Sequence, residues 1–495
     1  MGWNPHWDIH TFLHGRFVVS VSLEAEVENV SLGDKRLNRR LQKIVKELGD
    51  TPTLSIPAAT TSRAEMEGAY RFFDNDKVAP DKVLKHHYEL TEERISQKDF
   101  VLLVQDTTEL VLTRPSEKVA GAGPMDSEAR RGAFFHPLAA FSIDGLPLGM
   151  VWHKIWAREQ LGSHLSKRER SKKRSGSPIE EKESFRWIEG IRAARKTAKN
   201  CPRTTCVCVG DSEADIYETF AESRDFTTSD GEQGEVHLLV RARQARTTES
   251  GDWLEQARKA ECIYEGSFNV SPRSEPRIAK NMPRKRQLPR AARIANVEVR
   301  ATSVKLCPPY RHDRKLQQVS VNLVLIEETK PPKDCEPISW LLATSLPIGT
   351  PDEVKRIATS YCVRWQIEIF FRTLKSGCRI EQRQFEKLNR IVNCLAVYSI
   401  VAWRVTHLCH LGRQCPDLNC EVVFEPCEWK AVYKIVKKKA PPSTPPRLNE
   451  IIRMVAGLGG YVNRKSTEPG PQTLWIGLQR VHDLSTAWNE FRTVP

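Results

Sequence analysis

Three features are missing from the sequence, and each absence excludes a class of protein. No stretch approaches the ~18 uninterrupted apolar residues that a membrane-spanning helix needs. The first residues, MGWNPHWDIH, lack the basic segment and apolar run of a secretory signal. The 13 cysteines are odd in number and scattered, which is typical of reduced thiols rather than of a disulfide framework. We therefore expect a cytoplasmic protein that has no membrane partner.

One group of metal-binding residue types is incomplete as well. Histidines and cysteines gather in HLCHLGRQCPDLNC, residues 407–420. They lack the paired C-x-x-C spacing of ordinary zinc modules, so a structural role is the better interpretation of this group.

The chain carries an excess of positive charge on an otherwise ordinary globular composition. Of 495 residues, 40% are hydrophobic and 28% are charged, which excludes wholesale disorder. A chain of this length predicts about two to four domains. Lys and Arg number 76 against 62 Asp and Glu, a formal net charge of +14. This excess favours a polyanionic partner such as nucleic acid, although ribosome-associated and membrane-surface proteins share it.

The segment 31–50, SLGDKRLNRRLQKIVKELGD, has the spacing of an amphipathic helix, with Gly49 as its predicted C-cap. Its apolar positions are Leu37, Leu41, Ile44 and Leu48. A second face is basic and consists of Arg36, Arg39, Arg40 and Lys43. That face is either a solvated surface or a set of contacts to DNA phosphates. We favour phosphate contacts because a single acidic residue, Glu47, stands among the basic ones after Asp34.

From about residue 100 the pattern predicts an α/β core. DFVLLVQDTTEL has a buried-strand centre, 101–104, and a hairpin is predicted to turn at Asp144-Gly145. KESFRWIEGIRAARKTA is typical of a helix, and TTCVCVGDSEADIYETF of a strand, a turn and a helix. Strands separated by a crossover helix indicate an α/β sheet.

Two further regions differ from this core. Within residues 235–346, IANVEVRATSVKL and QQVSVNLVLI alternate apolar and polar positions with period two, which predicts a β-rich insertion containing the basic loop 283–293. After residue 385 the pattern is helical again, with a proline-rich linker at 437–447. The charged run KRERSKKR, 167–174, is typical of a loop that could touch a phosphate backbone.

Two aspartates follow apolar strands, and a mixed polar stripe follows later in the chain. Asp106 and Asp211 stand where functional groups gather in α/β sheets, although each alone could equally cap a turn or a helix. In YCVRWQIEIFFRTLK, helical geometry puts one narrow stripe of polar side chains opposite an apolar face. The stripe consists of Tyr361, Arg364, Glu368 and Lys375. Three carboxylates from three elements would suit Mg²⁺ ions that act on a phosphodiester.

These residues also resemble the signature of a known family. Tyr361, Arg364, Glu368 and Lys375 have the YREK spacing of the insertion-sequence-four DDE transposases, the group that includes the Tn-five transposase. Other segments resemble that family in the same order, from about residue 30 to residue 480: EMEGAYRFFDN at 65–75, QDTT at 105–108, GDSEADIY at 210–217, SWLLATS at 339–345, and LGGYVNRK at 458–465 with Trp475.

The resemblance implies a fold and a set of residue roles. It implies an α/β, RNase H-like catalytic core in which Asp106, Asp211 and Glu368 are the catalytic residues and the metal ligands. Two Mg²⁺ ions per site are implied, and Mn²⁺ would be able to substitute. The implied DNA-binding residues beside them are Tyr361, Arg364, Lys375, Arg372 and Trp340, of which Trp340 would stack on a flipped base. Without the resemblance, Trp340 would be an ordinary strand aromatic.

The resemblance also implies a reaction and partners. Water cuts one strand at the transposon end, the 3′ hydroxyl forms a hairpin, and the reopened end joins target DNA. The implied partners are DNA with terminal inverted repeats, target DNA and a second subunit in a synaptic homodimer. We expect a helical DNA-binding domain at 1–76, a catalytic domain at 77–390 with its insertion at about 235–346, and a helical dimerisation domain at 391–495. The implied location is the bacterial cytoplasm.

One departure and two alternatives accompany this interpretation. The family often has Arg after the second catalytic Asp, whereas this chain has Ser212, so a basic contact is either missing or supplied from elsewhere, such as the run 167–174. The first alternative is a transposase-derived DNA-binding regulator without cleavage activity. The second is a metal-dependent nuclease that does not join strands.

Overall fold

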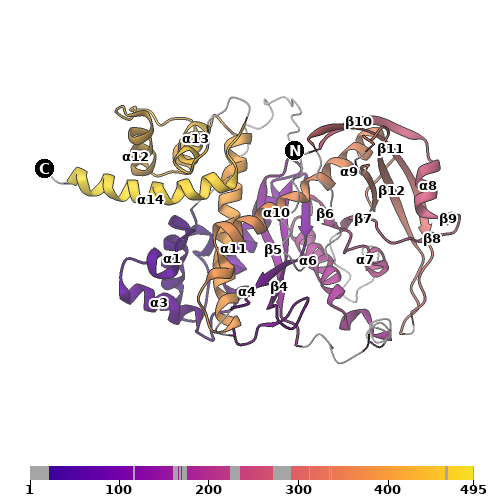
Figure 1. Ribbon diagram of the computed structural model, residues 1–495, viewed down its shortest axis with the longest axis horizontal. Helices are drawn as coiled ribbons and strands as arrows, with labels where there is room; N and C mark the ends of the chain where they lie inside the picture. The colour runs from indigo at the N-terminus through magenta and orange to yellow at the C-terminus, as the bar shows by residue number, and fades with distance from the viewer. Residues whose placement is uncertain are drawn as a thin grey trace.

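Helices enclose one central sheet in the part of the chain that the structure describes (Figure 1). The computed structural model describes residues 22–114, 118–159, 166, 169, 176–222, 235–270, 291–311, 313–333, 335, 337–462 and 467–493. The predicted basic loop at 283–293 and the charged run at 167–174 lie almost wholly outside these residues.

Short helices make up the N-terminal part: η2 (Ala25–Val27), α1 (Lys35–Asp50), α2 (Ile56–Ala59), α3 (Arg63–Phe73) and α4 (Pro80–Ser96). The predicted amphipathic helix is confirmed as α1, which Asp34 caps by accepting a hydrogen bond from the Arg36 N–H. The prediction that Gly49 is the C-cap is wrong, because the helix continues to Asp50. Gly49 is instead needed for packing, since a Cβ there would lie 1.9 Å from Leu23 Cδ1.

The central sheet has the strand order of an RNase H-like core. Its central strands are β1 (Phe100–Gln105), β4 (Arg131–Ser142), β5 (Pro147–Trp156), β6 (Thr205–Gly210) and β7 (Val236–Arg241). They lie in the order β5-β4-β1-β6-β7; β4 is antiparallel to β1 and β5, and β1, β6 and β7 are parallel. The predicted hairpin, crossover helix α6 (Arg186–Asn200) and strand–turn–helix ending in α7 (Tyr217–Glu222) are confirmed. The short strands β2 (Thr108–Val111) and β3 (Gly123–Pro124) also pair with β4.

The β-rich segment extends the same sheet instead of forming a separate one. It contains β8 (Thr247–Thr248), β9 (Gly251–Asp252), α8 (Trp253–Lys259), β10 (Cys262–Val270), β11 (Arg293–Leu306), β12 (Val319–Glu328) and β13 (Ser339–Thr344). Strand β13 pairs with β7, and β12 and β11 follow outward from it. The last strand of the core is therefore covered on its open edge by the segment that follows it in sequence.

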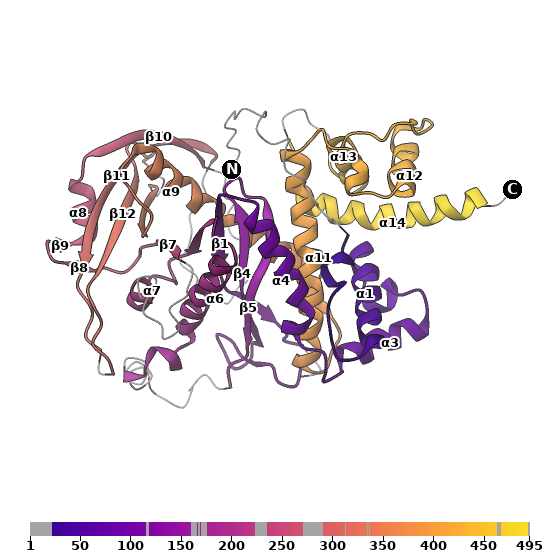
Figure 2. The same ribbon diagram turned by 180° about the vertical axis from the view of Figure 1, so that it is seen from behind.

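Helices cover both faces of the core sheet. Alternate residues of β1 point to opposite faces, so Val101 and Leu103 pack with α6, whereas Leu102 and Val104 belong to a larger apolar cluster. That larger cluster includes residues of α4 and of α11 (Leu388–Gln414). Seen from behind, α4, α6 and α11 stand beside β4 and β5 (Figure 2).

The polar stripe lies on two helices and a π turn. The segment forms α9 (Pro351–Val363), α10 (Trp365–Arg372) and the π-helical η5 (Thr373–Gly377), followed by the 3-10 turn η6 (Ile380–Gln382). One regular helix from 361 to 375 is therefore not what forms: α9 ends before Arg364, and Lys375 lies in the π turn. The apolar side of α10 is confirmed as buried, with Ile367, Phe370 and Phe371 in the core.

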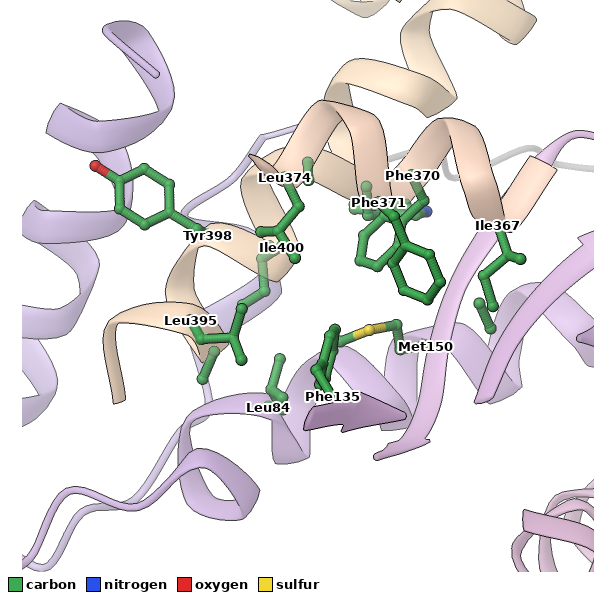
Figure 3. Close-up of a cluster of buried hydrophobic side chains, with 14 of the residues drawn as sticks. Leu84, Phe135, Met150, Ile367, Phe370, Phe371, Leu374, Leu395, Tyr398 and Ile400 are labelled. Carbon is green, nitrogen blue, oxygen red and sulfur yellow. The ribbon is translucent and has the colours of Figure 1, made fainter. Parts of the chain in front are cut away.

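A dense apolar cluster fixes α10 against the sheet. Figure 3 shows Phe370 and Phe371 on the side of Phe135 of β4 and Met150 of β5, whereas Leu374 of η5 is directed toward Ile400 of α11. The rings of Phe135 and Phe371 meet edge to face with their centres 6.4 Å apart. A helix held this way presents its polar side in a fixed direction.

The C-terminal part is helical, as the pattern predicted. It contains α11, η7 (Cys420–Val422), α12 (Pro426–Lys437), α13 (Leu448–Leu458) and α14 (Pro471–Thr493), and the last of these extends away from the body (Figure 1). In the described ranges α11 alone is long and apolar enough to cross a membrane, but 89% of its most apolar window is buried inside the protein. It is a core helix, and the histidines and cysteines of 407–410 lie on it.

Candidate active site

Asp106 lies where the first core strand ends. Strand β1 stops at Gln105, and the chain resumes pairing with β4 only at Thr108, so Asp106 stands in the gap between two strands. Its Oδ1 accepts a hydrogen bond from the Thr107 N–H at 2.7 Å. Burial raises the pKa of Asp106 to about 7, the charge of Asp211 adds to this rise, and Arg364 opposes it.

Asp211 lies at the end of the neighbouring strand. Strands β1 and β6 are parallel and in register, with Val104 opposite Val209, so Asp106 and Asp211 leave the same edge of the sheet. The Asp211 Oδ1 accepts from the Glu213 N–H at 2.8 Å, which is the turn-capping contact considered as an alternative. The capping contact and a chemical role are compatible, because a carboxylate has a second oxygen.

Arg364 connects the strand end to the helix that carries Glu368. Its Nη1 lies 3.2 Å from Asp106 Oδ2, and its Nη2 lies 3.0 Å from Glu368 Oε1. The Arg364 side chain is 8% exposed, and its Nε has no hydrogen-bond partner among the described residues. The break between α9 and α10 falls at this residue. The structure thus brings the predicted Asp106, Asp211, Arg364 and Glu368 together.

The chemistry of the donor set fits a divalent cation. All three predicted ligands supply carboxylate oxygens, which hard ions such as Mg²⁺ prefer. The raised pKa of Asp106 reflects burial beside a second negative charge, a combination that a bound cation would stabilise. In the described ranges no three Asp, Glu, His or Cys side chains are already arranged around one point. Arg364 is the cation that balances Asp106 and Glu368 here.

Tyr361 and Trp340 stand next to Arg364. Tyr361 is 2% exposed, and its ring meets the half-buried Trp340 edge to face with ring centres 5.9 Å apart. On its other side Trp340 packs against Phe268 at 5.8 Å. The Arg364 guanidinium carbon lies 5.8 Å from the Tyr361 ring centre. Trp340 therefore has the surroundings of an ordinary strand aromatic, and its stacking on a flipped base stays a prediction.

Lys375 and Arg372 lie beyond Glu368, toward the C-terminal helices. Lys375 Nζ is 3.6 Å from Glu381 Oε1. The exposed Arg372 donates from Nη2 to Gln472 Oε1 of α14 at 2.9 Å. With Arg379 of the turn after η5, Arg372 lines a hollow of about 500 Å³ beside α14. Lys375 and Arg372, for which DNA contacts were predicted, thus have protein partners in this structure.

The basic residues of α1 lie in the N-terminal part and do not join the carboxylates. Arg36 is exposed and pairs with Asp34 at 3.1 Å, and Lys43 forms an ion pair with Glu65 of α3. Arg39 is exposed, whereas Arg40 is partly buried against α3. Their contact with DNA stays a prediction.

Sequence reasoning missed Arg186, the first residue of α6. Its Nε donates to Thr107 Oγ1 at 2.8 Å and its Nη2 to Glu213 Oε2 at 2.7 Å. Because Ser212 follows the second aspartate, the sequence left a basic contact here either missing or supplied from elsewhere, such as the run 167–174. The available signal was position: Arg186 opens the helix that leads directly into the strand ending at Asp211.

The DDE class of DNA-processing enzymes is defined by an RNase H-like sheet that carries acidic residues at two adjacent strand ends. A third acidic residue lies on a later helix. Three family descriptions match the chain in order: "Transposase DNA-binding" over residues 22–78, "Transposase DDE domain" over 188–403 and "Transposase Tn5 dimerisation domain" over 400–489. The DDE match contains Asp211 and Glu368, and Asp106 lies before it. The chain belongs to the Tn5-like DDE transposases.

These matches confirm the catalytic class and two of its partners. The protein is a DDE transposase with a DNA-binding domain and a dimerisation domain. Among solved structures, it is similar to one described as "Cryo-EM structure of piggyBac transposase synaptic complex with hairpin DNA (SNHP)". That likeness has 8% sequence identity and a TM-score of 0.35, and covers 96% of this chain and 79% of the other. It is too distant to support an argument.

Proposed function

We propose that this protein is a cut-and-paste transposase that cleaves both strands at the ends of its own element and joins the ends to new DNA. The observation that carries the proposal is the placement of three carboxylates from separate elements near one edge of the sheet, without yet surrounding one point. Asp106 and Asp211 end neighbouring parallel strands, and Arg364 ties Glu368 to Asp106. A transposase that only bound DNA would gain nothing from a buried carboxylate whose pKa is raised to about 7.

In this proposal Asp106, Asp211 and Glu368 hold two Mg²⁺ ions, which Mn²⁺ can replace. Bound divalent ions of this kind activate the attacking oxygen and stabilise the leaving oxygen of a phosphodiester. The chain's own contribution is position: the sheet edge fixes both aspartates, and the apolar face of α10 fixes Glu368.

The basic and aromatic residues around the carboxylates bind the DNA end. Arg364 is placed to exchange a carboxylate for a phosphate, because its guanidinium lies between Asp106 and Glu368. Tyr361 donates a hydrogen bond from its hydroxyl to the terminal DNA strand, and Lys375 and Arg372 contact phosphates further along that strand. Trp340 stacks on a base that leaves the duplex beside the cut.

The reaction is a series of phosphoryl transfers at one site. Water cuts the first strand, the freed 3′ hydroxyl attacks the opposite strand to leave a hairpin, a second water opens the hairpin, and the 3′ hydroxyl then joins target DNA. Two subunits assemble on the paired inverted repeats, in the bacterial cytoplasm. Residues 1–76 recognise the ends, 77–390 with the insertion at about 235–346 carry the chemistry, and 391–495 pair the subunits.

The test uses the gene's own locus as substrate. Purified protein is incubated with a linear fragment containing the gene and its flanks, with Mg²⁺ or Mn²⁺, and products are separated on denaturing and native gels. The expected result is an excised fragment with hairpin ends, followed by joining to a supercoiled target plasmid. A gel shift without cut strands would instead support the DNA-binding regulator, and cut ends that never join a target would support the nuclease.

Variants of the carboxylates test the residue assignment. Asp106→Ala, Asp211→Ala and Glu368→Ala are each expected to abolish cleavage and to leave the gel shift in place. The matched control is Glu255→Ala, because Glu255 is a 59% exposed carboxylate of α8 whose ion pair, with Arg258, lies at the surface. Cleavage at the wild-type rate in any of the three variants would remove that residue from the site.

A further inference from the structure

One arginine side chain joins the two loops that carry the aspartates. Arg186 donates from Nε to the hydroxyl of Thr107, the residue after Asp106. It donates from Nη2 to Glu213, whose own N–H donates to Asp211. The planar guanidinium fork therefore spans the ends of β1 and β6 through two hydrogen bonds of 2.8 and 2.7 Å.

The arginine itself is held firmly. The Arg186 residue is 9% exposed, and its Nη1 donates to the Glu183 carbonyl at 2.9 Å. Its guanidinium carbon lies 5.3 Å from the ring centre of Trp187 and 5.6 Å from that of Trp156. Contacts on several sides leave the fork little freedom, so it can transmit position from α6 to both loops.

The Thr107 end of the bridge is anchored to the sheet as well. Thr107 Oγ1 lies 2.8 Å from His136 Nδ1, and His136 Nε2 lies 3.1 Å from Gln105 Oε1. Gln105 in turn donates to the Trp187 carbonyl at 3.3 Å, which returns the chain of contacts to α6. A closed network of this kind is more rigid than a single pair.

The charge of Arg186 also acts on the site. Burial lowers the pKa of its guanidinium, and the charges of Glu213, Glu183, Asp211 and Asp106 act against that shift. Two aspartates at one sheet edge repel each other, and a nearby positive charge reduces that repulsion. The same positive charge would repel a metal ion, so its electrostatic effect and its positioning effect on metal affinity have opposite signs.

We propose that Arg186 is a positioning residue that sets the separation of the Asp106 and Asp211 carboxylates through Thr107 and Glu213. The inference rests on the proposed function, since it assigns Arg186 to the spacing of the proposed metal ligands. Arg186 also supplies a positive charge beside Asp106 and Asp211, a charge that comes neither from position 212 nor from the run 167–174.

The test measures Mn²⁺ binding to the full chain without DNA, by electron paramagnetic resonance of the free ion. Arg186→Gln is expected to weaken Mn²⁺ binding about 10-fold or more, the usual effect of losing a residue that orients metal ligands. Arg186→Lys is expected to weaken it similarly, because lysine keeps the charge but cannot bridge both loops. The matched control is Arg192→Gln on the same helix. Arg192 forms an ion pair with Glu222 at 2.9 Å, and its substitution is expected to leave Mn²⁺ binding unchanged.

The outcomes separate the inference from the proposed function. Tighter Mn²⁺ binding in Arg186→Gln, or wild-type binding in Arg186→Lys, would mean that Arg186 acts through charge alone and would overturn the positioning role. Absence of Mn²⁺ binding in the wild-type protein would instead contradict the proposed metal site. If Arg186→Gln does not fold, as judged by circular dichroism, Thr107→Val decides: it removes the Nε partner without changing charge, and unchanged Mn²⁺ binding would refute the bridge.

Discussion

The strongest test of how the N-terminal part is attached concerns Glu26, a carboxylate with no exposed surface. It forms an ion pair with Arg94 of α4 and lies 2.5 Å from His87 Nδ1 on the same helix. Arg94 also donates to the Leu148 carbonyl of β5 at 3.0 Å, and its guanidinium carbon lies 4.4 Å from the ring centre of Trp403. One buried charge thus links the segment before α1 to the core.

Removal of Glu26 should therefore be costly. Deleting one partner of a buried ion pair costs about 3–5 kcal/mol, because the remaining charge stays buried without compensation. Arg94 is 18% exposed, so water can reach it and the lower end of that range applies to Glu26→Ala. Glu26→Gln keeps one acceptor oxygen and is expected to cost about 1–2 kcal/mol. The control is Glu67→Ala, whose ion pair with Arg63 is exposed on both sides and is worth at most about 0.5 kcal/mol.

Hydrogen exchange read by mass spectrometry measures this cost locally, which suits a multidomain chain. A loss of about 3 kcal/mol corresponds to roughly 100-fold faster exchange of amides in α4 in Glu26→Ala. Exchange in α4 that matched the Glu67→Ala control would refute the reasoning, because it would mean that the Glu26 charge is not what holds α4 in place.

Three other predictions concern the C-terminal helices. Burial lowers the pKa of His407 to about 4, whereas in the unfolded chain its pKa is about 6.5. Between pH 7 and pH 5 the unfolded chain therefore binds a proton at this position that the folded chain does not, and His407 alone should contribute about 2 kcal/mol to the loss of stability. Thermal unfolding at both pH values should show a smaller loss in His407→Gln, and an equal loss would exclude this histidine as the cause. Gly457→Ala should raise the melting temperature by the equivalent of about 0.5–1 kcal/mol, since the site is helical and a Cβ there meets no atom within 4 Å. Gly477→Ala should lower the free energy of unfolding by about 1–3 kcal/mol, and the melting temperature with it, because its Cβ would lie 2.0 Å from the Val455 carbonyl oxygen. Equal shifts of the melting temperature in the two glycine variants would contradict the packing of α13 on α14.

Local patterns were sufficient to predict the core elements. Apolar runs bounded by turn residues marked β1, β6 and the hairpin at Gly145, and helical spacing marked α1 and α6. The adjacency of Asp106 and Asp211 followed from the same patterns, since a strand, a crossover helix and a second strand place both strand ends at one edge.

Contacts between distant parts of the chain could not be predicted in this way. The pairing of Arg364 with Asp106 joins residues 258 positions apart, and no local spacing encodes it. The bridge from Arg186 to Thr107 depends on how α6 packs, and the close contact between Gly49 and Leu23 depends on how the segment before α1 folds back on the helix. In each case tertiary packing decides what the local sequence leaves open.

The sequence separation between Asp106 and Arg364 also means that the ribosome makes these two residues at different times. At about 5–20 residues per second, a ribosome needs roughly 13–50 s to advance across these 258 residues. Throughout that interval the nascent chain already contains the residues of α1 and β1, but it lacks both Arg364 and Glu368, which complete the candidate site. A message broken within this stretch would yield a fragment that retains the DNA-binding region, 22–78, and lacks α10. Under the proposed function, such a fragment would bind DNA ends without cutting them.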